Sequence, residues 1–176
     1  YGGSAEKPLQ PLSASALVGV LADAVGPGAV NFVNALHLAA ARGIPVKQIR
    51  LGSYGPYSEY VDLRLEGAGG ETRVAGALLA PDYPRVVRIG DYHVDIVPRG
   101  SLVVLRNRDV PGVIGRVGTV LGNAGINIAE YHQSRLEAGG TALAAIGVDG
   151  KLSVEVMEAL RALPEVYDVR QVQLGE

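Results

Sequence analysis

The sequence contains no cysteine and no tryptophan, and only one methionine and one phenylalanine among its 176 residues. The absence of cysteine excludes a disulfide framework, a thiolate zinc site and an iron–sulfur cluster held by this chain alone. No apolar run reaches the roughly 18 residues that a membrane span needs. The net charge is −2, without the basic excess of a nucleic-acid binder. We therefore expect a globular, cytoplasmic protein with no membrane or nucleic-acid partner.

Glycine is abundant, with 24 residues, and there are 10 prolines. This composition predicts short elements separated by frequent turns. Residues 1–12 are polar and rich in turn-forming residues, which predicts a frayed lead-in or linker. The chain begins at Tyr1 rather than at a methionine, so we expect it to be a processed chain or a fragment.

Residues 13–99 are predicted to form a first domain, in which two helices precede antiparallel strands. Apolar residues at helical spacing predict helices over Ser13–Val25 and Ala29–Arg42, with Gly43 ending the second helix. After Pro45 the apolar spacing changes to two, which predicts strands. The predicted strands are Val46–Leu51, Glu59–Glu66, Thr72–Leu79, Arg85–Ile89 and Tyr92–Val97.

Residues 101–176 are predicted to form a second domain, whose elements alternate as strand, helix, strand, strand, helix, strand. Right-handed connections fold this order into a ferredoxin-like sandwich, with two helices on one face of a four-stranded antiparallel sheet. The predicted class is therefore α+β, a helix-plus-antiparallel-sheet domain followed by a ferredoxin-like βαββαβ domain. The predicted elements are Leu102–Leu105, a helix opened by Asp109–Pro111 and stopped by Gly125, Ile126–Arg135, Thr141–Val148, Ser153–Leu163 and Val166–Leu174.

Sequence signatures of catalysis and metal binding are missing. His37, His93 and His132 have no second ligand at metal-binding spacing, and no serine lies in a G-x-S-x-G turn. The segment Gly26–Asn31 has the spacing of a dinucleotide fingerprint, but it follows a predicted helix and lacks the third glycine. We expect this chain to have no catalytic activity, metal or cofactor of its own.

The most distinctive chemistry lies at the start of the first helix of the second domain. The segment Pro111-Gly112 begins the helix, and the backbone N–H groups of such an end attract a carboxylate. Asp109 beside it can pair with an ammonium group, or it can cap the helix. A positive helix end next to a negative side chain suits a zwitterion, which means a free amino acid.

Glycines recur along the same helix at positions i, i+3, i+6 and i+10. This spacing places a strip without side chains on one side of the helix. Two interpretations stay open, namely close packing of the helix on the sheet and backbone access for a small ligand. The four residues are Gly112, Gly115, Gly118 and Gly122.

These segments resemble a known family. Residues 107–118 (NRDVPGVIGRVG) and 126–129 (INIA) are similar to the ACT domain, an amino-acid-sensing module. Upstream, residues 30–35 (VNFVNA), 84–87 (PRVV) and 91–95 (DYHVD) resemble the allosteric substrate binding domain found in the long form of D-3-phosphoglycerate dehydrogenases. The combination identifies the sequence as similar to the C-terminal regulatory region of that family.

The resemblance implies that L-serine binds between the ACT domains of neighbouring subunits. It implies a homodimer or tetramer joined through the ACT edge strands, with Asn127 reaching the ligand from the adjoining subunit. It also implies an NAD-dependent parent oxidoreductase of L-serine biosynthesis, whose catalytic and NAD domains lie outside this chain. The implied serine-binding residues are Asn107, Asp109, Val110, Pro111, Gly112, Val113, Ile114, Asn127 and Ile128.

Further alternatives concern the first domain and the function. Arg85, Arg88 and His93 are candidates for an anion site that takes a phosphorylated metabolite, since arginine grips phosphate with a planar fork. The other interpretation of the three residues is a solvated strand face. The rival functions are an oligomerisation module without a ligand and the regulatory part of an iron–sulfur serine dehydratase.

Overall fold

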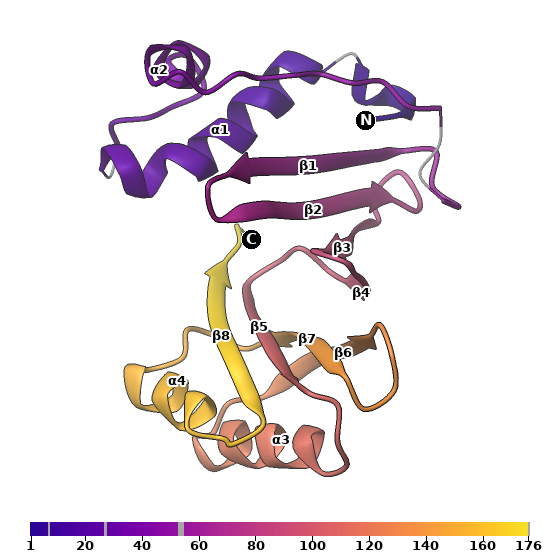
Figure 1. Cartoon of the computed structure of the whole chain (residues 1–176), viewed down its shortest axis with the longest axis vertical. Helices are drawn as coiled ribbons and strands as arrows, with labels where there is room; N and C mark the ends of the chain where they lie inside the picture. Colours follow the sequence, from indigo (N-terminus) through magenta and orange to yellow (C-terminus); the bar gives the residue numbers. More distant parts are fainter. Residues whose placement is uncertain (7, 27, 53–54, 176) are drawn as a thin grey trace. The chain divides into compact units, whose positions relative to one another are not determined.

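The computed structural model describes residues 1–6, 8–26, 28–52 and 55–175. There are two compact units, Tyr1–Leu63 with Ala77–Leu79, and Arg64–Gly76 with Ala80–Glu176. Figure 1 labels the elements, which are η1 (Gly3–Glu6), α1 (Leu9–Val25), α2 (Ala35–Ala41), β1 (Tyr60–Gly67), β2 (Gly70–Leu78), β3 (Pro84–Ile89), β4 (Tyr92–Ile96), β5 (Ser101–Arg108), α3 (Val113–Asn123), β6 (Ile128–Arg135), β7 (Thr141–Val148), α4 (Val154–Arg161) and β8 (Val166–Gln173).

Helices α1 and α2 supply the apolar core of the first unit. Leu17 and Leu21 of α1 are buried in one cluster with Ala35 and Ala39 of α2. Helix α1 begins four residues earlier than predicted, because Pro11 lies in its first turn, where a missing N–H breaks no helical bond. The segment predicted to be a lead-in therefore contains η1 and the first residues of α1.

Helix α2 is shorter than the predicted helix Ala29–Arg42. In the turn before it, the Asn31 side chain accepts hydrogen bonds from the backbone N–H groups two and three residues later, at 2.9 and 3.1 Å. The Asn34 side chain accepts one from the Asn31 N–H at 2.8 Å. Such side-chain bonds compete with helical backbone bonds, so the helix starts late. Its end is as predicted, since Gly43 follows with a φ of 68°.

The prediction of a strand over Val46–Leu51 is wrong. The segment is irregular, and the side chains of Val46, Ile49 and Leu51 are exposed. Its backbone bonds include a Leu51 N–H donated to the Tyr1 carbonyl at 3.0 Å and the Tyr1 amino group donated to the Ile49 carbonyl at 3.1 Å. The alternating pattern is present, but these bonds join it to a terminal residue instead of a neighbouring strand.

The other four predicted strands of the first domain form a sheet in the order β1-β2-β3-β4. Strands β3 and β4 pair in antiparallel fashion, with Arg88 opposite His93 and Ile89 opposite Tyr92. Gly90 turns the chain between them with a φ of 57°, a conformation that favours glycine. Gly90 thus provides the tight turn that joins the two strands predicted at Arg85–Ile89 and Tyr92–Val97.

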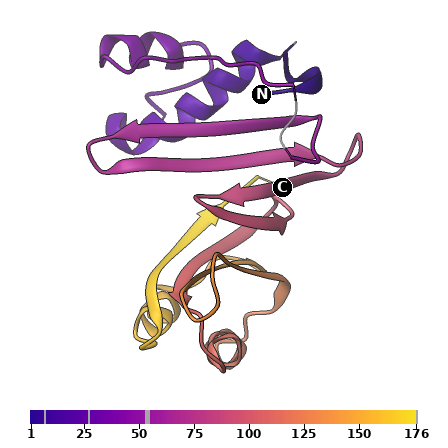
Figure 2. The same ribbon diagram turned by 45° about the vertical axis from the view of Figure 1, so that its right-hand side comes forward.

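The ferredoxin-like fold predicted for the second domain is confirmed. The strand order is β6-β7-β5-β8 with every pairing antiparallel, so β6 and β8 are the edges. Figures 1 and 2 show α3 and α4 on the same face of this sheet. Their buried core joins Val103 and Leu105 of β5 to Val113, Val117 and Leu121 of α3.

The glycines of α3 do not serve close packing on the sheet. A Cβ atom added at Gly115, Gly118 or Gly122 would meet no atom within 4 Å. The interpretation of these three positions as close helix–sheet contacts is therefore wrong. Gly112, at the N-cap, differs because its φ is 89° and an added Cβ would lie 2.8 Å from Nη1 of Arg116.

Candidate functional site

A cleft of about 380 Å³ lies beside the connection from β5 to α3. One side comes from this connection, and the other comes from the end of β6 and the turn that follows it. Five of the nine predicted serine-binding residues line it. The lining residues are Asp109, Val110, Pro111, Gly112, Ile114, Gln133, Arg135 and Gly139.

Asp109 is held toward the turn after β6. Its Oδ2 accepts hydrogen bonds from Nη1 of Arg135 at 2.9 Å and from the backbone N–H of Gly139 at 3.2 Å. Its own N–H donates to the Gly140 carbonyl at 2.8 Å. Helix α3 has Gly112 as its N-cap and receives no side-chain cap. The alternative in which Asp109 caps the helix is therefore not what the structure shows.

The charges around the cleft are of both signs. The hydrogen bond from Arg135, followed by that from the Gly139 N–H, lowers the pKa of the Asp109 carboxyl below its ordinary value. The uncapped first turn of α3 carries a partial positive charge of roughly half an elementary unit. The cleft thus places an ionised carboxylate near both a guanidinium group and a positive helix end.

Two predicted contacts are buried away from the cleft. Asn107 is fully buried; its Nδ2 donates to the Arg108 carbonyl at 2.7 Å, and its Oδ1 has no hydrogen-bond partner among the described residues. Val113 is only 1% exposed, within the core. A ligand contact from Asn107 stays a prediction, and it requires the side chain to leave its present position.

Asn127 and Ile128 lie at the other end of β6. The Asn127 Nδ2 donates to Oδ2 of Asp149 at 3.0 Å, and the Asp149 N–H donates to the Asn127 carbonyl at 3.1 Å. Asn127 and Arg135 are eight positions apart along the strand, which corresponds to about 25 Å. Asn127 and Ile128 therefore cannot reach the cleft of their own chain. Their predicted role depends on a second copy of the chain.

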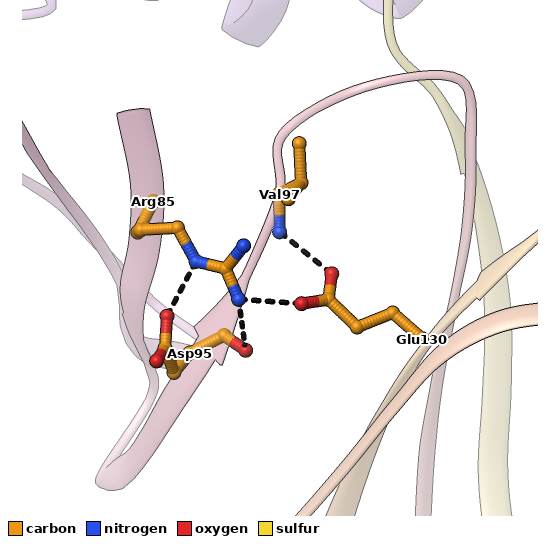
Figure 3. Close-up of polar contacts among 4 residues, drawn as sticks. All are labelled: Arg85, Asp95, Val97 and Glu130. Atoms are coloured by element: carbon orange, nitrogen blue, oxygen red, sulfur yellow. Dashed lines mark hydrogen bonds and ion pairs between the residues drawn. The ribbon is translucent and has the colours of Figure 1, made fainter. Parts of the chain in front are cut away.

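Arg85, one of the three residues of the predicted anion site, has acidic partners. Figure 3 shows its guanidinium group between two carboxylates, with Nε 2.5 Å from Asp95 and Nη2 2.5 Å from Glu130. The second oxygen of Glu130 accepts the Val97 N–H at 2.9 Å. Burial acts to lower the pKa of Arg85, but the bonds to Glu130 and Asp95 outweigh it and raise that pKa.

Arg88 and His93 are opposite each other on β3 and β4, apart from the Arg85 network. Nε of Arg88 donates to the Gly90 carbonyl at 2.8 Å. The structure thus brings two of the three anion-site candidates together and gives the third a different set of partners. An anion site at these residues stays a prediction.

Sequence reasoning missed Gln133, Arg135 and Gly139. Gln133 and Arg135 lie on the same face of β6 as Tyr131, which packs against the core. The available signal was that Gln133 and Arg135 follow Tyr131 at every second position, so that polar side chains lie on the core-facing side of the predicted strand. This signal indicated a special role for the end of β6, but the sequence alone did not show that this end meets Asp109.

A second cleft, of about 480 Å³, lies between the start of α4 and β8. Three cationic residues line it, Lys151, Arg161 and Arg170, and its lining contains no carboxylate. This chemistry suits an anion rather than a zwitterion. Among the residues that the structure describes, no cluster of three or more side chains could hold a metal ion, and no helix is long and apolar enough to cross a membrane.

Comparison with known families assigns both parts of the chain. Residues 1–90 match the D-3-phosphoglycerate dehydrogenase intervening domain, and residues 101–165 match the ACT domain. The chain belongs to the D-3-phosphoglycerate dehydrogenase intervening-domain family. The resemblance inferred from the motifs at residues 30–35 and 107–118 is thereby confirmed.

Relatives named D-3-phosphoglycerate dehydrogenase match most of the chain. They include the proteins of Synechocystis sp. (31% identity over 94% of this chain), Archaeoglobus fulgidus (34% over 82%) and Mycobacterium tuberculosis (33% over 99%). The chain spans only 30%, 28% and 33% of these relatives' lengths, respectively. It corresponds to the regulatory ACT region of D-3-phosphoglycerate dehydrogenase homologues.

Proposed function

We propose that this chain is the amino-acid-sensing region of an NAD-dependent D-3-phosphoglycerate dehydrogenase of the cytoplasm, and that it binds L-serine beside Asp109. The observation that carries the proposal is the cleft in which the Asp109 carboxylate lies close to the uncapped start of α3. The carboxylate attracts the ammonium group of a free amino acid, and the helix end attracts its carboxylate. Membership of an ACT family supports this choice of ligand class.

A second copy of the chain completes the proposed site. Strand β6 is an edge of its sheet, and edge strands offer backbone groups for pairing with another chain. In a β6-to-β6 homodimer, Asn127 and Ile128 of one subunit approach the cleft of the other. Serine then favours one arrangement of the subunits. The free energy that couples serine binding to this arrangement is typically about 1–3 kcal/mol.

Calorimetry of the chain with L-serine, glycine and L-glutamate tests the choice of ligand. We expect L-serine to bind, and Asp109→Asn to weaken it at least about tenfold, because the variant removes the charge that faces the ammonium group. An oligomerisation module without a ligand would give no heat with any of the three amino acids at millimolar concentration.

Mixing two defective variants tests the shared site. Asp109→Asn and Asn127→Ala each damage one side of every site in their own homodimer. A mixed dimer has one of its two sites with both residues intact. About half of the dimers are mixed after subunit exchange in an equimolar mixture, so serine binding should return at about a quarter of all sites. If the mixture binds no better than either variant alone, Asn127 does not complete the site of a partner.

A further inference from the structure

We propose that Arg135 binds the α-carboxylate of the ligand, and that ligand binding replaces the Arg135–Asp109 ion pair with two new ion pairs. The inference rests on the proposed function, because it names the group that receives each end of the amino acid. In the structure, Nη1 of Arg135 lies 2.9 Å from Oδ2 of Asp109. When the amino acid binds, its ammonium group takes this place at Asp109, and the guanidinium group turns to the ligand carboxylate.

Asp109 is the fixed member of the pair. Its side chain is only 15% exposed, and it also accepts the Gly139 N–H. Its backbone N–H is bonded to the Gly140 carbonyl. These bonds do not involve Arg135, so the carboxylate keeps its position when the guanidinium group moves away.

Arg135 is the movable member. It occupies the last position of β6, and its side chain is 60% exposed. Water solvates the guanidinium group at this exposure, and a long side chain loses entropy when it is held, so its attachment to Asp109 is weak. A ligand that offers a carboxylate in exchange can therefore draw the guanidinium group away from Asp109.

Arg116 lies in the first turn of α3, and it is already engaged. It donates from Nε and Nη2 to the two carboxylate oxygens of Glu165, at 3.3 and 2.7 Å. The Glu165 side chain is 13% exposed, and the ligand proposed beside Asp109 offers it no ammonium group, so removing Arg116 would leave a largely buried carboxylate without this partner. Of these two arginines, Arg135 is thus the one that can be redirected at lower cost.

The two oxygens of the ligand carboxylate can then be shared between two donors. One faces the N–H groups at the start of α3, and the other faces the planar fork of Arg135. The amino acid is neutral as a whole, so the exchange leaves the net charge of the cleft unchanged. A ligand with the ammonium group but no carboxylate must displace Arg135 without giving it a new partner.

Calorimetry with L-serine and ethanolamine separates the two ends of the ligand, since ethanolamine is serine without its carboxylate. We expect Arg135→Gln to weaken L-serine at least about tenfold. Ethanolamine should bind this variant as well as or better than the unsubstituted chain, because Arg135 no longer competes for Asp109. Arg135→Lys, which keeps the charge, should restore part of the serine affinity.

Arg106→Gln is the matched control, because Arg106 is exposed on β5, on the opposite face from the buried Leu105, and lines neither of the two clefts. It should leave both affinities unchanged. Serine affinity that survives Arg135→Gln, or an equal loss for serine and ethanolamine, would overturn the role of Arg135 while the proposed function stands. If the unsubstituted chain binds neither compound, both proposals are wrong.

Discussion

Strand β6 makes one ion pair from each of its faces, and the two pairs differ in burial and in their surroundings. On one face, Glu130 meets Arg85, whose side chain is 7% exposed. On the other face, Arg135 meets Asp109, and the Arg135 side chain is 60% exposed. The buried guanidinium group also bonds to Asp95, whereas the exposed one borders a cleft.

The difference shows why an ion pair at a ligand site is left close to solvent. A buried charge that loses its partner is left in a poorly solvated position, so a buried pair resists exchange. An exposed guanidinium group can change partners because water solvates it during the exchange. The Glu130 end of β6 is thus suited to holding structure, and the Arg135 end is suited to recognition.

Removing the buried arginine should have the largest effect on stability. Arg85→Met leaves Glu130 and Asp95 without a cation, and we expect it to lower the free energy of unfolding by about 2–3 kcal/mol. Asp95 is 55% exposed, so water compensates part of the loss. Urea denaturation measures the change. A loss below about 0.5 kcal/mol would put the buried pair in the same class as the exposed one.

Beside the Asp109 cleft, the substitution with the largest expected effect on stability acts through the backbone conformation. Gly112 has a φ of 89°, in the left-handed region. Gly112→Ala should lower the free energy of unfolding by about 1–2 kcal/mol, because the added Cβ strains this conformation and approaches Arg116. Gly122→Ala in the same helix is the control, since its Cβ would meet open space. Equal losses in the two variants would show that the strain at Gly112 is negligible.

The exposed pair should matter little for stability. Arg135→Gln is expected to change the free energy of unfolding by less than about 1 kcal/mol. The measurement is the same urea denaturation, without added amino acid. The comparison between the two ends of β6 fails if this variant loses as much stability as Arg85→Met.

Tyr131 lies between the two ion pairs on β6 and gives the smallest predicted effect near neutral pH. Burial raises the pKa of its hydroxyl to about 12, compared with about 10 in an unfolded chain. The contribution of the neutral Tyr131 hydroxyl to the free energy of unfolding is therefore present below pH 10 and is lost as the pH rises toward 12. Between these pH values, the free energy of unfolding should fall less in Tyr131→Phe than in the unsubstituted chain. Urea denaturation at pH 8 and pH 11 measures the fall in each protein. An equal fall in the two proteins would contradict the raised pKa of Tyr131.

The second domain could be predicted well from the sequence because its signals are local. The bounds of β7 agree with the predicted Thr141–Val148. Gly125 follows the end of α3 with a φ of 71°, as the sequence predicted. The first domain was harder, because side-chain bonds from Asn31 and Asn34 replace the first turns of a predicted helix. Propensity patterns do not include such competing bonds.

The candidate site could be predicted only on one side. Asp109 to Gly112 are consecutive, so their chemistry was visible in a single segment. Arg135 and Gly139 come from a later segment, and the pairing of β6 with β7 and of β7 with β5 brings that segment to Asp109. Spatial pairing of this kind is a property of the sheet register, which the sequence pattern alone did not specify.

The most direct test of the account is to follow the backbone amide signals of an isotope-labelled chain by nuclear magnetic resonance while L-serine is added. We expect the largest shifts at Asp109, Gly112 and Ile114, and at Gly139 across the cleft. Shifts centred on the second cleft at Lys151–Val154, or no shifts at millimolar serine, would contradict binding beside Asp109.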